Sequence, residues 1–468
     1  MTATAHWTLL APGTASDMSG GHQYNRRICA GLTELGQPTD LRYLPGHYPQ
    51  VDLSTVTQAA AIFNALPVGS KVIVDGLAFG ALPELMKTQA RRLHLFALVH
   101  LPLADETGLM PVDAESLRNG EIAALSVATG VMVTSAYCAR RLQAYGIAPS
   151  RVRSVPPGVD IPLAFSKAPS GPTLQLLCVA NITPRKAQHV LLAALNDLQD
   201  LPWHCTLIGS LTHAPDYVAQ LQQQISHCGL QDRLTLTGSL PHDQVTSYYR
   251  QTDVFVLPSV FETYGMVITE ALAHGLPLVT TTGGALVDTV PEGSGLCVPP
   301  NDVSALQAAL REVIAQPTTR QNLAARAVAA CQHFSSWSEA ARLFHHAIND
   351  LAHQIPTEPH PGNEREYFSG EWLALRQAAD HQARATPLNE QLLTALKARY
   401  SPTSTTINVV DLGTGSGSNV RYLAPRLQTA LPWLTQKWTL VDHDPELLNQ
   451  ARTACNDLDL TLIPLQAD

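Results

Sequence analysis

Long hydrophobic runs are missing from this sequence of 468 residues. No stretch approaches the roughly 20 continuous apolar residues that a membrane-spanning helix needs. The first 13 residues include a short apolar run, but they lack the basic region and the small-residue cleavage site of a signal peptide. These two absences predict a cytoplasmic protein without a transmembrane segment.

Positive charge is also scarce. There are 30 Lys and Arg against 39 Asp and Glu, a formal net charge of −9, whereas a nucleic-acid-binding protein usually presents a basic face. The eight cysteines form no C-x-x-C pair, so we expect reduced, mostly buried thiols rather than a disulfide framework. The 18 histidines show no convincing metal-binding spacing. The sequence therefore predicts no nucleic-acid partner and no metal site.

The sequence does contain a regular alternation of short apolar runs with amphipathic segments. This rhythm is typical of βαβ units and a parallel sheet. The apolar runs lie at 7–11, 41–44, 71–75, 93–100, 131–135 and 152–155, and then at 174–180, 205–209, 234–238, 254–258 and 278–281.

Proline and glycine interrupt this alternation near residues 156–172 and again at 355–362, which indicates domain boundaries. We predict an α/β protein with two doubly wound, Rossmann-like domains that face a cleft. The expected parts are a first domain at 1–165, a second domain at 166–352, a linker at 353–365 and a partial Rossmann-like domain at 366–468.

Two glutamates stand where a predicted strand turns into a short helix. Glu262 follows the run 254–258, and Glu270 is the only charge in the helical segment 266–273. The first helical turn, near Gly265, carries unpaired N–H groups that bind anions. Two acids at a helix start can also be ordinary surface residues. The buried strand, the glycine and the uncharged helix favour a site for a nucleotide-linked sugar, with a carboxylate that accepts hydrogen bonds from ribose hydroxyls.

Basic, histidine and glycine residues lie at other predicted strand ends. Arg185 and Lys186 precede a predicted helix, where two cations oppose the helix dipole unless an anion is present. His100 ends a strand, at the edge where α/β sheets bind ligands. Gly20 and Gly21 lie in the first predicted β–α loop, where glycine lets the backbone approach a ligand. A solvated basic pair and a structural histidine are the alternative interpretations.

With these residues, positions 1–350 resemble the retaining GT-B glycosyltransferases of family four, which are marked by E-x7-E. The resemblance implies that Glu270 binds the nucleotide ribose and that Glu262 and His100 are catalytic residues facing the donor sugar. The further donor-binding residues that it implies are Arg185, Lys186, Gly20, Gly21 and the backbone around Tyr264, Gly265 and Met266. One departure is Ala180-Asn181, which stands where many members carry Gly-Arg; the number of cations on the diphosphate stays open.

The function implied is transfer of a hexosyl group, with retention of configuration, from a nucleotide sugar to a saccharide or lipid-linked acceptor, as in polysaccharide biosynthesis. The leaving diphosphate develops negative charge, and the sugar ring develops oxocarbenium character. Arg185, Lys186 and the helix start can stabilise the negative charge, and Glu262 can stabilise the positive charge on the ring. No cofactor is expected, because the nucleotide sugar is the donor substrate. A nucleotide-sugar epimerase and a non-catalytic scaffold remain alternatives. The base, the sugar, the acceptor, the oligomeric state and any peripheral membrane association stay open.

The last hundred residues carry a different signature. A strand at 407–411 opens a turn with the pattern D-x-G-x-G-x-G, and a strand at 437–441 leads to Asp442, which is suitably placed for ribose hydroxyls. This segment resembles the start of a class I S-adenosylmethionine-dependent methyltransferase, with a generic Rossmann-like turn as the alternative. The resemblance implies S-adenosylmethionine binding by Asp411, Gly413, Gly415, Gly417, Asp442 and Asp468.

A class I methyltransferase sheet has seven strands, and the sequence shows only three, at 407–411, 437–441 and 461–465. The half that normally lines the methyl acceptor is not found. We therefore expect a truncated domain without methyltransferase activity of its own.

Overall fold

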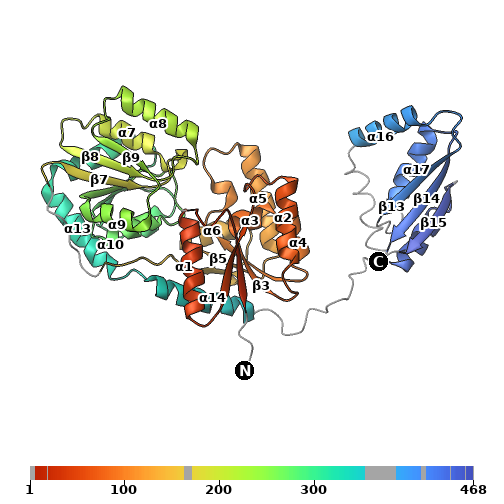
Figure 1. The fold of residues 1–468 in the computed structure, drawn as a ribbon, viewed down its shortest axis with the longest axis horizontal. Helices are drawn as coiled ribbons and strands as arrows, with labels where there is room; N and C mark the ends of the chain where they lie inside the picture. The colour runs from red at the N-terminus through yellow and green to blue at the C-terminus, as the bar shows by residue number, and fades with distance from the viewer. Residues whose placement is uncertain are drawn as a thin grey trace. The chain divides into compact units, whose positions relative to one another are not determined.

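The computed structural model of the protein describes residues 6–17, 19–162, 171–353, 386–412, 418–442, 444–458 and 460–466. The chain separates into two compact units, residues 1–357 and 358–468, whose elements are labelled in Figure 1. The larger unit contains two six-stranded parallel sheets, and the smaller unit contains a three-stranded parallel sheet. No helix in the described ranges is long and apolar enough to span a membrane.

The first domain has a parallel sheet with the strand order β2-β1-β3-β4-β5-β6. Neighbouring residues of one strand enter different buried clusters: Leu10 joins the cluster on one side of the sheet, and Leu9 joins the other. A sheet buried on both faces explains why its strands read as continuous apolar runs. The strands are β1 (Trp7–Pro12), β2 (Thr39–Leu44), β3 (Lys71–Asp75), β4 (His94–Val99), β5 (Gly130–Val133) and β6 (Val152–Ser154). The helices are α1 (Gly20–Glu34), α2 (Leu53–Asn64), α3 (Gly76–Ala81), α4 (Pro83–Gln89), α5 (Pro111–Ser126), α6 (Ala136–Ala144) and the 3-10 turns η1 (Leu103–Asp105) and η2 (Pro149–Arg151).

The second domain repeats this design with the order β12-β11-β10-β7-β8-β9. Its most buried strands lie at the centre, where all four residues of β10 are buried. The strands are β7 (Leu174–Val179), β8 (Trp203–Ile208), β9 (Leu234–Gly238), β10 (Val254–Leu257), β11 (Leu278–Thr281) and β12 (Gly295–Val298). The helices are α7 (Gln188–Asn196), α8 (Pro215–His227), α9 (His242–Gln251), α10 (Met266–Ala273), α11 (Leu286–Thr289), α12 (Val303–Ala315), α13 (Pro317–Cys331) and the 3-10 turn η3 (Pro184–Lys186).

Helix α14 (Trp337–His353) follows the second domain in sequence but packs on the first. Its residues Phe344, Ile348 and Leu351 join the same buried cluster as Leu9 of β1, and Figure 1 shows the helix beside α1. The approach is close enough that a Cβ on Gly31 of α1 would lie 2.4 Å from the Cβ of Ala341. Helix α14 thus links the end of the second domain back to the first domain.

The smaller unit contains β13 (Thr406–Leu412), β14 (Thr435–Asp442) and β15 (Thr461–Gln466), paired in parallel in that order. The described helices of this unit are α16 (Thr386–Arg399), α17 (Ser418–Ala430) and α18 (Pro445–Ala454). One face of the sheet is buried through Trp438 and Leu440, whereas Val410 and Leu465 are more than half exposed. The three predicted strands of this region are therefore present.

The predicted fold class is confirmed, with strand ends that shift by one or two residues. One strand, β12, was not predicted from the sequence. It is a four-residue edge strand whose first three residues are partly or fully exposed, so it lacks the apolar run that marks a buried strand. All eight cysteines are unpaired, and six of them are buried.

Candidate functional site

The two glutamates of the E-x7-E segment lie on either side of the start of α10. The backbone leaves β10, and Gly265 then precedes the helix with a φ angle of +84°, in the left-handed region that favours glycine. No side chain caps this helix start, and its first turn contains no acid. The unpaired N–H groups of the first turn are therefore able to bind an anion.

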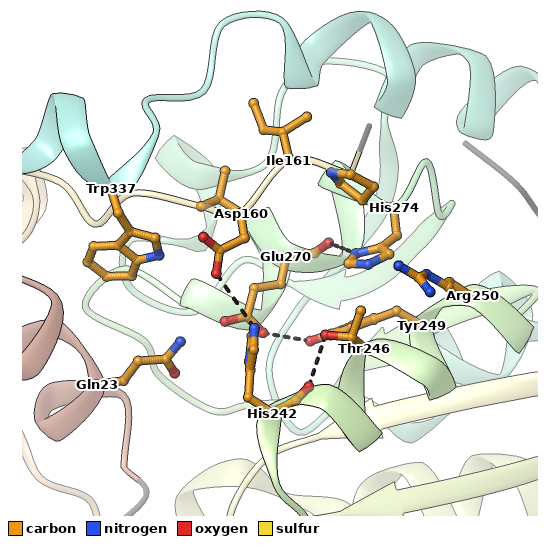
Figure 2. A pocket seen from close by; sticks show the side chains of 12 residues that line it. Gln23, Asp160, Ile161, His242, Thr246, Tyr249, Arg250, Glu270, His274 and Trp337 are labelled. Carbon is orange, nitrogen blue, oxygen red and sulfur yellow. Dashed lines mark hydrogen bonds and ion pairs between the residues drawn. The ribbon is translucent and has the colours of Figure 1, made fainter. Parts of the chain in front are cut away.

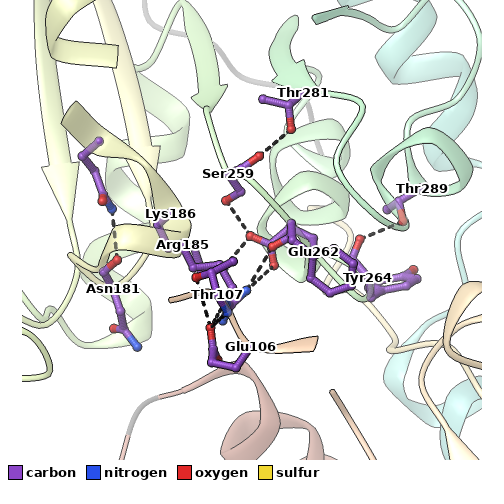
Figure 3. Close-up of polar contacts among 12 residues, drawn as sticks. Glu106, Thr107, Asn181, Arg185, Lys186, Ser259, Glu262, Tyr264, Thr281 and Thr289 are labelled. Atoms are coloured by element: carbon purple, nitrogen blue, oxygen red, sulfur yellow. Dashed lines mark hydrogen bonds and ion pairs between the residues drawn. The ribbon is translucent and has the colours of Figure 1, made fainter. Parts of the chain in front are cut away.

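Glu262 is buried among groups that stabilise its negative charge, as Figure 3 shows. Its side chain accepts hydrogen bonds from Lys186 Nζ at 2.5 Å and Ser259 Oγ at 2.6 Å, and Arg185 Nη1 lies 3.5 Å away. Burial alone raises the pKa of Glu262, but the two cations outweigh it and hold this pKa below its ordinary value. Glu262 is therefore an ionised carboxylate.

Arg185 and Lys186 occupy the short turn η3, between β7 and α7. The carbonyl of Arg185 accepts a hydrogen bond from Val260 N at 2.8 Å, which fixes the turn against the Glu262 loop. Arg185 Nε also lies 3.0 Å from Glu106 Oε1 of the first domain. Burial lowers the pKa of Lys186, an effect that Glu262 opposes. The basic pair thus lies between Glu106 of the first domain and Glu262 of the second domain.

Glu270 instead contacts a neutral hydrogen-bond donor. Its Oε2 accepts a hydrogen bond from Tyr249 Oη at 2.9 Å, and burial raises the pKa of Glu270 while this hydrogen bond opposes the rise. Tyr249 is held in turn by His274, whose ring stacks on it at 4.9 Å. Figure 2 shows these side chains around a cavity of about 230 Å³, where Asp160 lies 3.6 Å from His242.

His100 follows β4 and is held by a chain of polar groups. Its Nε2 lies 3.0 Å from Asn25 Oδ1, and Asn25 Nδ2 donates to Asp75 Oδ2 at 2.8 Å. Since the amide nitrogen of Asn25 donates to Asp75, its oxygen accepts from His100. Burial lowers the pKa of His100, although Asp75 favours the charged form. A neutral His100 then carries its lone pair on Nδ1.

Gly20 and Gly21 begin helix α1 and do not lie in the preceding loop, which corrects the prediction from the sequence. The reason is the Ser19 hydroxyl, which caps the helix by accepting a hydrogen bond from His22 N at 3.3 Å. A Cβ on Gly21 would lie 3.2 Å from His100 Cδ2, and one on Gly20 would lie 3.6 Å from Met266 Sδ. The start of α1 therefore approaches both His100 and the start of α10.

These residues from two domains line one cleft of about 870 Å³. The predicted site residues among its lining are Gly20, Gly21, His100, Arg185, Lys186, Glu262, Tyr264, Gly265, Met266 and Glu270. Sequence reasoning missed Asn25, Asp75, Glu106, Tyr249 and Ser259. Of these, only Asp75 carried a signal, because it ends the strand β3 at the same edge as His100.

The departure at Ala180-Asn181 has a structural role. Asn181 Oδ1 accepts a hydrogen bond from Ser210 N at 3.3 Å, and its carbonyl accepts one from Gln188 Nε2 at 3.0 Å. Asn181 thus joins the loops that follow β7 and β8 and adds no cation. Within the described ranges, no group of three or more His, Cys, Asp or Glu side chains is arranged to hold a metal ion.

In the smaller unit, two of the six predicted S-adenosylmethionine-binding residues have described side chains. Asp411 and Asp442 are both buried near the carboxyl ends of the neighbouring strands β13 and β14. Asp411 Oδ1 accepts from Asn419 Nδ2 at 2.8 Å, and Asp442 Oδ1 accepts from Asp444 N at 3.1 Å. The other four, Gly413, Gly415, Gly417 and Asp468, lie outside the described residues.

Proteins with similar sequences carry glycosyltransferase names. Residues 163–329 match the family described as "Glycosyl transferases group 1". The chain is 30% identical over 249 residues to a D-inositol 3-phosphate glycosyltransferase of Kineococcus radiotolerans, covering 46% of this chain and 56% of that protein. A protein of the same name from Xylanimonas cellulosilytica is 30% identical over 213 residues, covering 42% and 51%. The chain spans only about half the length of these relatives, and the matches support the resemblance to glycosyltransferases.

Solved structures match a larger share of the chain. Sucrose-phosphate synthase from Thermosynechococcus elongatus gives a TM-score of 0.64 at 20% identity, over 75% of this chain and 100% of that one. Anabaena Alr3699/HepE in complex with UDP-glucose gives 0.57 at 17% identity, over 73% and 99%. These likenesses show the fold. The two Rossmann-like domains of the larger unit have the GT-B arrangement that the sequence predicts.

Proposed function

We propose that the larger unit is a retaining hexosyltransferase that moves a sugar from a nucleotide sugar to an acceptor hydroxyl. One observation carries the proposal: Glu262, Lys186 and Arg185 form a buried ion cluster beside an uncapped helix start, in a cleft between two domains. The match of residues 163–329 to glycosyl transferases group 1 supports it. The UDP-glucose bound to Anabaena Alr3699/HepE supports a nucleotide sugar as donor.

The diphosphate binds at the start of α10 and at the basic pair. The N–H groups that follow Gly265 supply uncharged donors, while Arg185 and Lys186 supply positive charge that the leaving group needs as its own negative charge grows. In the present structure the Glu106 carboxylate contacts Arg185. A diphosphate at Arg185 replaces this carboxylate.

Glu262 and His100 then face the sugar. The ionised Glu262 stabilises positive charge on the ring, because its carboxylate is buried and fixed by Lys186 and Ser259. The Asn25 amide contacts Nε2 of His100. The protein, and not the substrate, therefore sets the orientation of the ring and of its other nitrogen, Nδ1. Transfer on the face from which the leaving group departs gives a product with retained configuration.

Glu270 binds the ribose of the donor. Tyr249 already occupies Oε2, which leaves Oε1 and the remaining lone pair of Oε2 for two ribose hydroxyls. The carboxylate is poorly solvated and its pKa is raised. A hydrogen bond from a hydroxyl group to this carboxylate is therefore more favourable than one to an acid at the surface. Ribose binding and sugar activation are thus separate tasks for the two glutamates.

Calorimetric titration of the whole chain with UDP-, GDP- and ADP-sugars tests the proposal. We expect one of these donors to bind, and Glu270→Gln to weaken its binding at least tenfold. The control is Glu292→Gln, which changes an exposed residue away from the cleft and leaves the affinity unchanged. Equal donor affinity in the Glu270 variant contradicts the assignment. The anomeric configuration of the product, read by NMR, tests retention, and full turnover in EDTA tests the expected independence from metal.

For the smaller unit we propose binding of S-adenosylmethionine, which would supply an electrophilic methyl group. The described residues fit such a ligand: Asp442 is a buried carboxylate at a strand end, where it can accept hydrogen bonds from ribose hydroxyls. Titration with S-adenosylhomocysteine should show binding that Asp442→Asn removes and the exposed control Asp457→Asn keeps. The same weak or absent binding in all three proteins argues against a nucleoside site.

A further inference from the structure

The wall of the cleft that belongs to the first domain is rich in leucine. Five leucines line it, from α3, from the segment after β4 and from α5. They are Leu77, Leu101, Leu103, Leu109 and Leu117. This wall faces the second domain, since Glu106, in the same segment, contacts Arg185 there. The leucines therefore border the space that an acceptor enters beside the donor sugar.

The charged groups that the first domain brings to the cleft already contact other groups of the protein. Arg26 Nη1 donates to Asp17 O at 2.9 Å, and Arg27 forms an ion pair with Asp160. Asp75 accepts a hydrogen bond from Asn25, and Glu106 contacts Arg185; neither acid favours an anion. No lysine of the first domain belongs to the described lining. An anionic acceptor would thus meet no lysine on this side, and the guanidinium of Arg26 is bound to backbone carbonyls.

Two large apolar side chains that follow Leu109 in the chain are exposed. Met110 and Val112, which follow Leu109 at the start of α5, are 64% and 70% exposed. Exposed apolar side chains next to a cleft lined by leucines favour an apolar ligand. A free, fully polar saccharide gains nothing from these side chains.

We propose that the acceptor carries an apolar chain, an alkyl or prenyl group, that lies along the leucine wall while its sugar hydroxyl reaches the donor. This inference rests on the proposed glycosyl transfer and names its acceptor class. It also separates this chain from its curated relatives, whose printed name contains inositol 3-phosphate.

The test measures how affinity depends on chain length. Methyl, butyl, hexyl and octyl glucosides, each below its critical micelle concentration, are titrated into the whole chain saturated with the nucleoside diphosphate. We expect the affinity to rise by about two- to fourfold for each added CH₂ group, and inositol phosphate to bind more weakly than octyl glucoside. An affinity that is independent of chain length, or tighter binding of inositol phosphate, overturns the proposal.

Two variants locate the effect. Leu109→Asn with Leu117→Asn should remove most of the dependence on chain length, whereas Leu53→Asn, which changes an 82% exposed leucine outside the cleft lining, should keep it. Retained donor affinity in the double variant shows that the protein is folded. A chain-length dependence that survives in the double variant refutes the leucine wall as the site. If no nucleotide sugar binds while the dependence is present, only the proposed glycosyl transfer fails.

Discussion

Replacing Lys186 by Met tests whether the buried ion pair is the structural centre of the proposed donor site. Methionine keeps much of the apolar stem but removes the charge that contacts Glu262 at 2.5 Å. Breaking a buried pair costs roughly 3–5 kcal/mol, because it leaves a buried charge without compensation. Arg185 remains 3.5 Å from the other carboxylate oxygen, so we expect the lower end, about 3 kcal/mol. For a domain of this size, that lowers the melting temperature by about 6–12 °C.

Scanning calorimetry and urea unfolding measure this loss. The matched control is Lys87→Met, which removes a lysine of an exposed pair with Glu84 and should change stability little. A double variant of Lys186→Met and Glu262→Gln should lose less than the sum of the two single losses, because no unpaired charge remains. Strict additivity, or a loss below about 1 kcal/mol for Lys186→Met, refutes the reasoning.

The pH dependence gives an independent check. The pKa of Glu262 lies below its ordinary value in the folded protein, so the pair contributes stability that is present above the pKa of the unfolded carboxyl, about 4.3. This contribution is lost as the pH falls through the lower, folded pKa. Lys186→Met removes the main cation that lowers this pKa. The difference in unfolding free energy between the wild type and the variant should therefore narrow as the pH falls below about 4.3, towards the lower pKa of the folded protein.

Two further predictions concern other buried acids. Tyr249→Phe removes the hydrogen bond that opposes the raised pKa of Glu270, so the donor KM should rise severalfold, and most at acidic pH; a KM ratio that does not vary between pH 5.5 and 8 contradicts this. Burial raises the pKa of Glu121 to about 8, although the N–H of Leu103 favours its charged form. Between pH 4.5 and 8 the folded chain keeps a proton that the unfolded chain has lost, so the unfolding free energy falls as pH rises. Glu121→Gln should remove this slope in urea unfolding at pH 5.5 and 8, and an unchanged slope refutes it.

The fold was predictable because its strands are buried on both faces. Lys71–Asp75 and Val254–Leu257 are short, continuous apolar runs bounded by turns, and both became central strands. The packing of α14 on the first domain was not predictable, because the apolar stripe around Phe344 shows only that the helix is buried, not against which domain.

The site was predictable where one segment carries it, and not where distant segments meet. Glu262, Gly265 and Glu270 share one strand-to-helix turn, so spacing alone places them. The contact of Arg185 with Glu106 joins two domains, and the link from His100 to Asn25 spans 75 residues. Such pairs depend on strand order, which a single sequence does not give. The start of α1 at Gly20 was missed for a different reason: glycine is a poor helix former, and the cap on Ser19 outweighs this.

The structure gives the two glutamates of one motif opposite electrostatic environments. Two cations lower the pKa of Glu262, while burial beside a neutral phenol raises the pKa of Glu270. Environments that separate the pKa values of two carboxylates assign them different tasks. Glu262 is charged in the absence of a ligand, which suits the proposed role beside a cationic sugar ring. Glu270 has the Tyr249 hydroxyl as a neutral donor. The ribose hydroxyls of the proposed donor would add further hydrogen bonds to the ionised form, so affinity should increase as pH rises through the pKa of Glu270. The seven residues between the two acids thus set where they lie, and the side chains around each acid decide what it does.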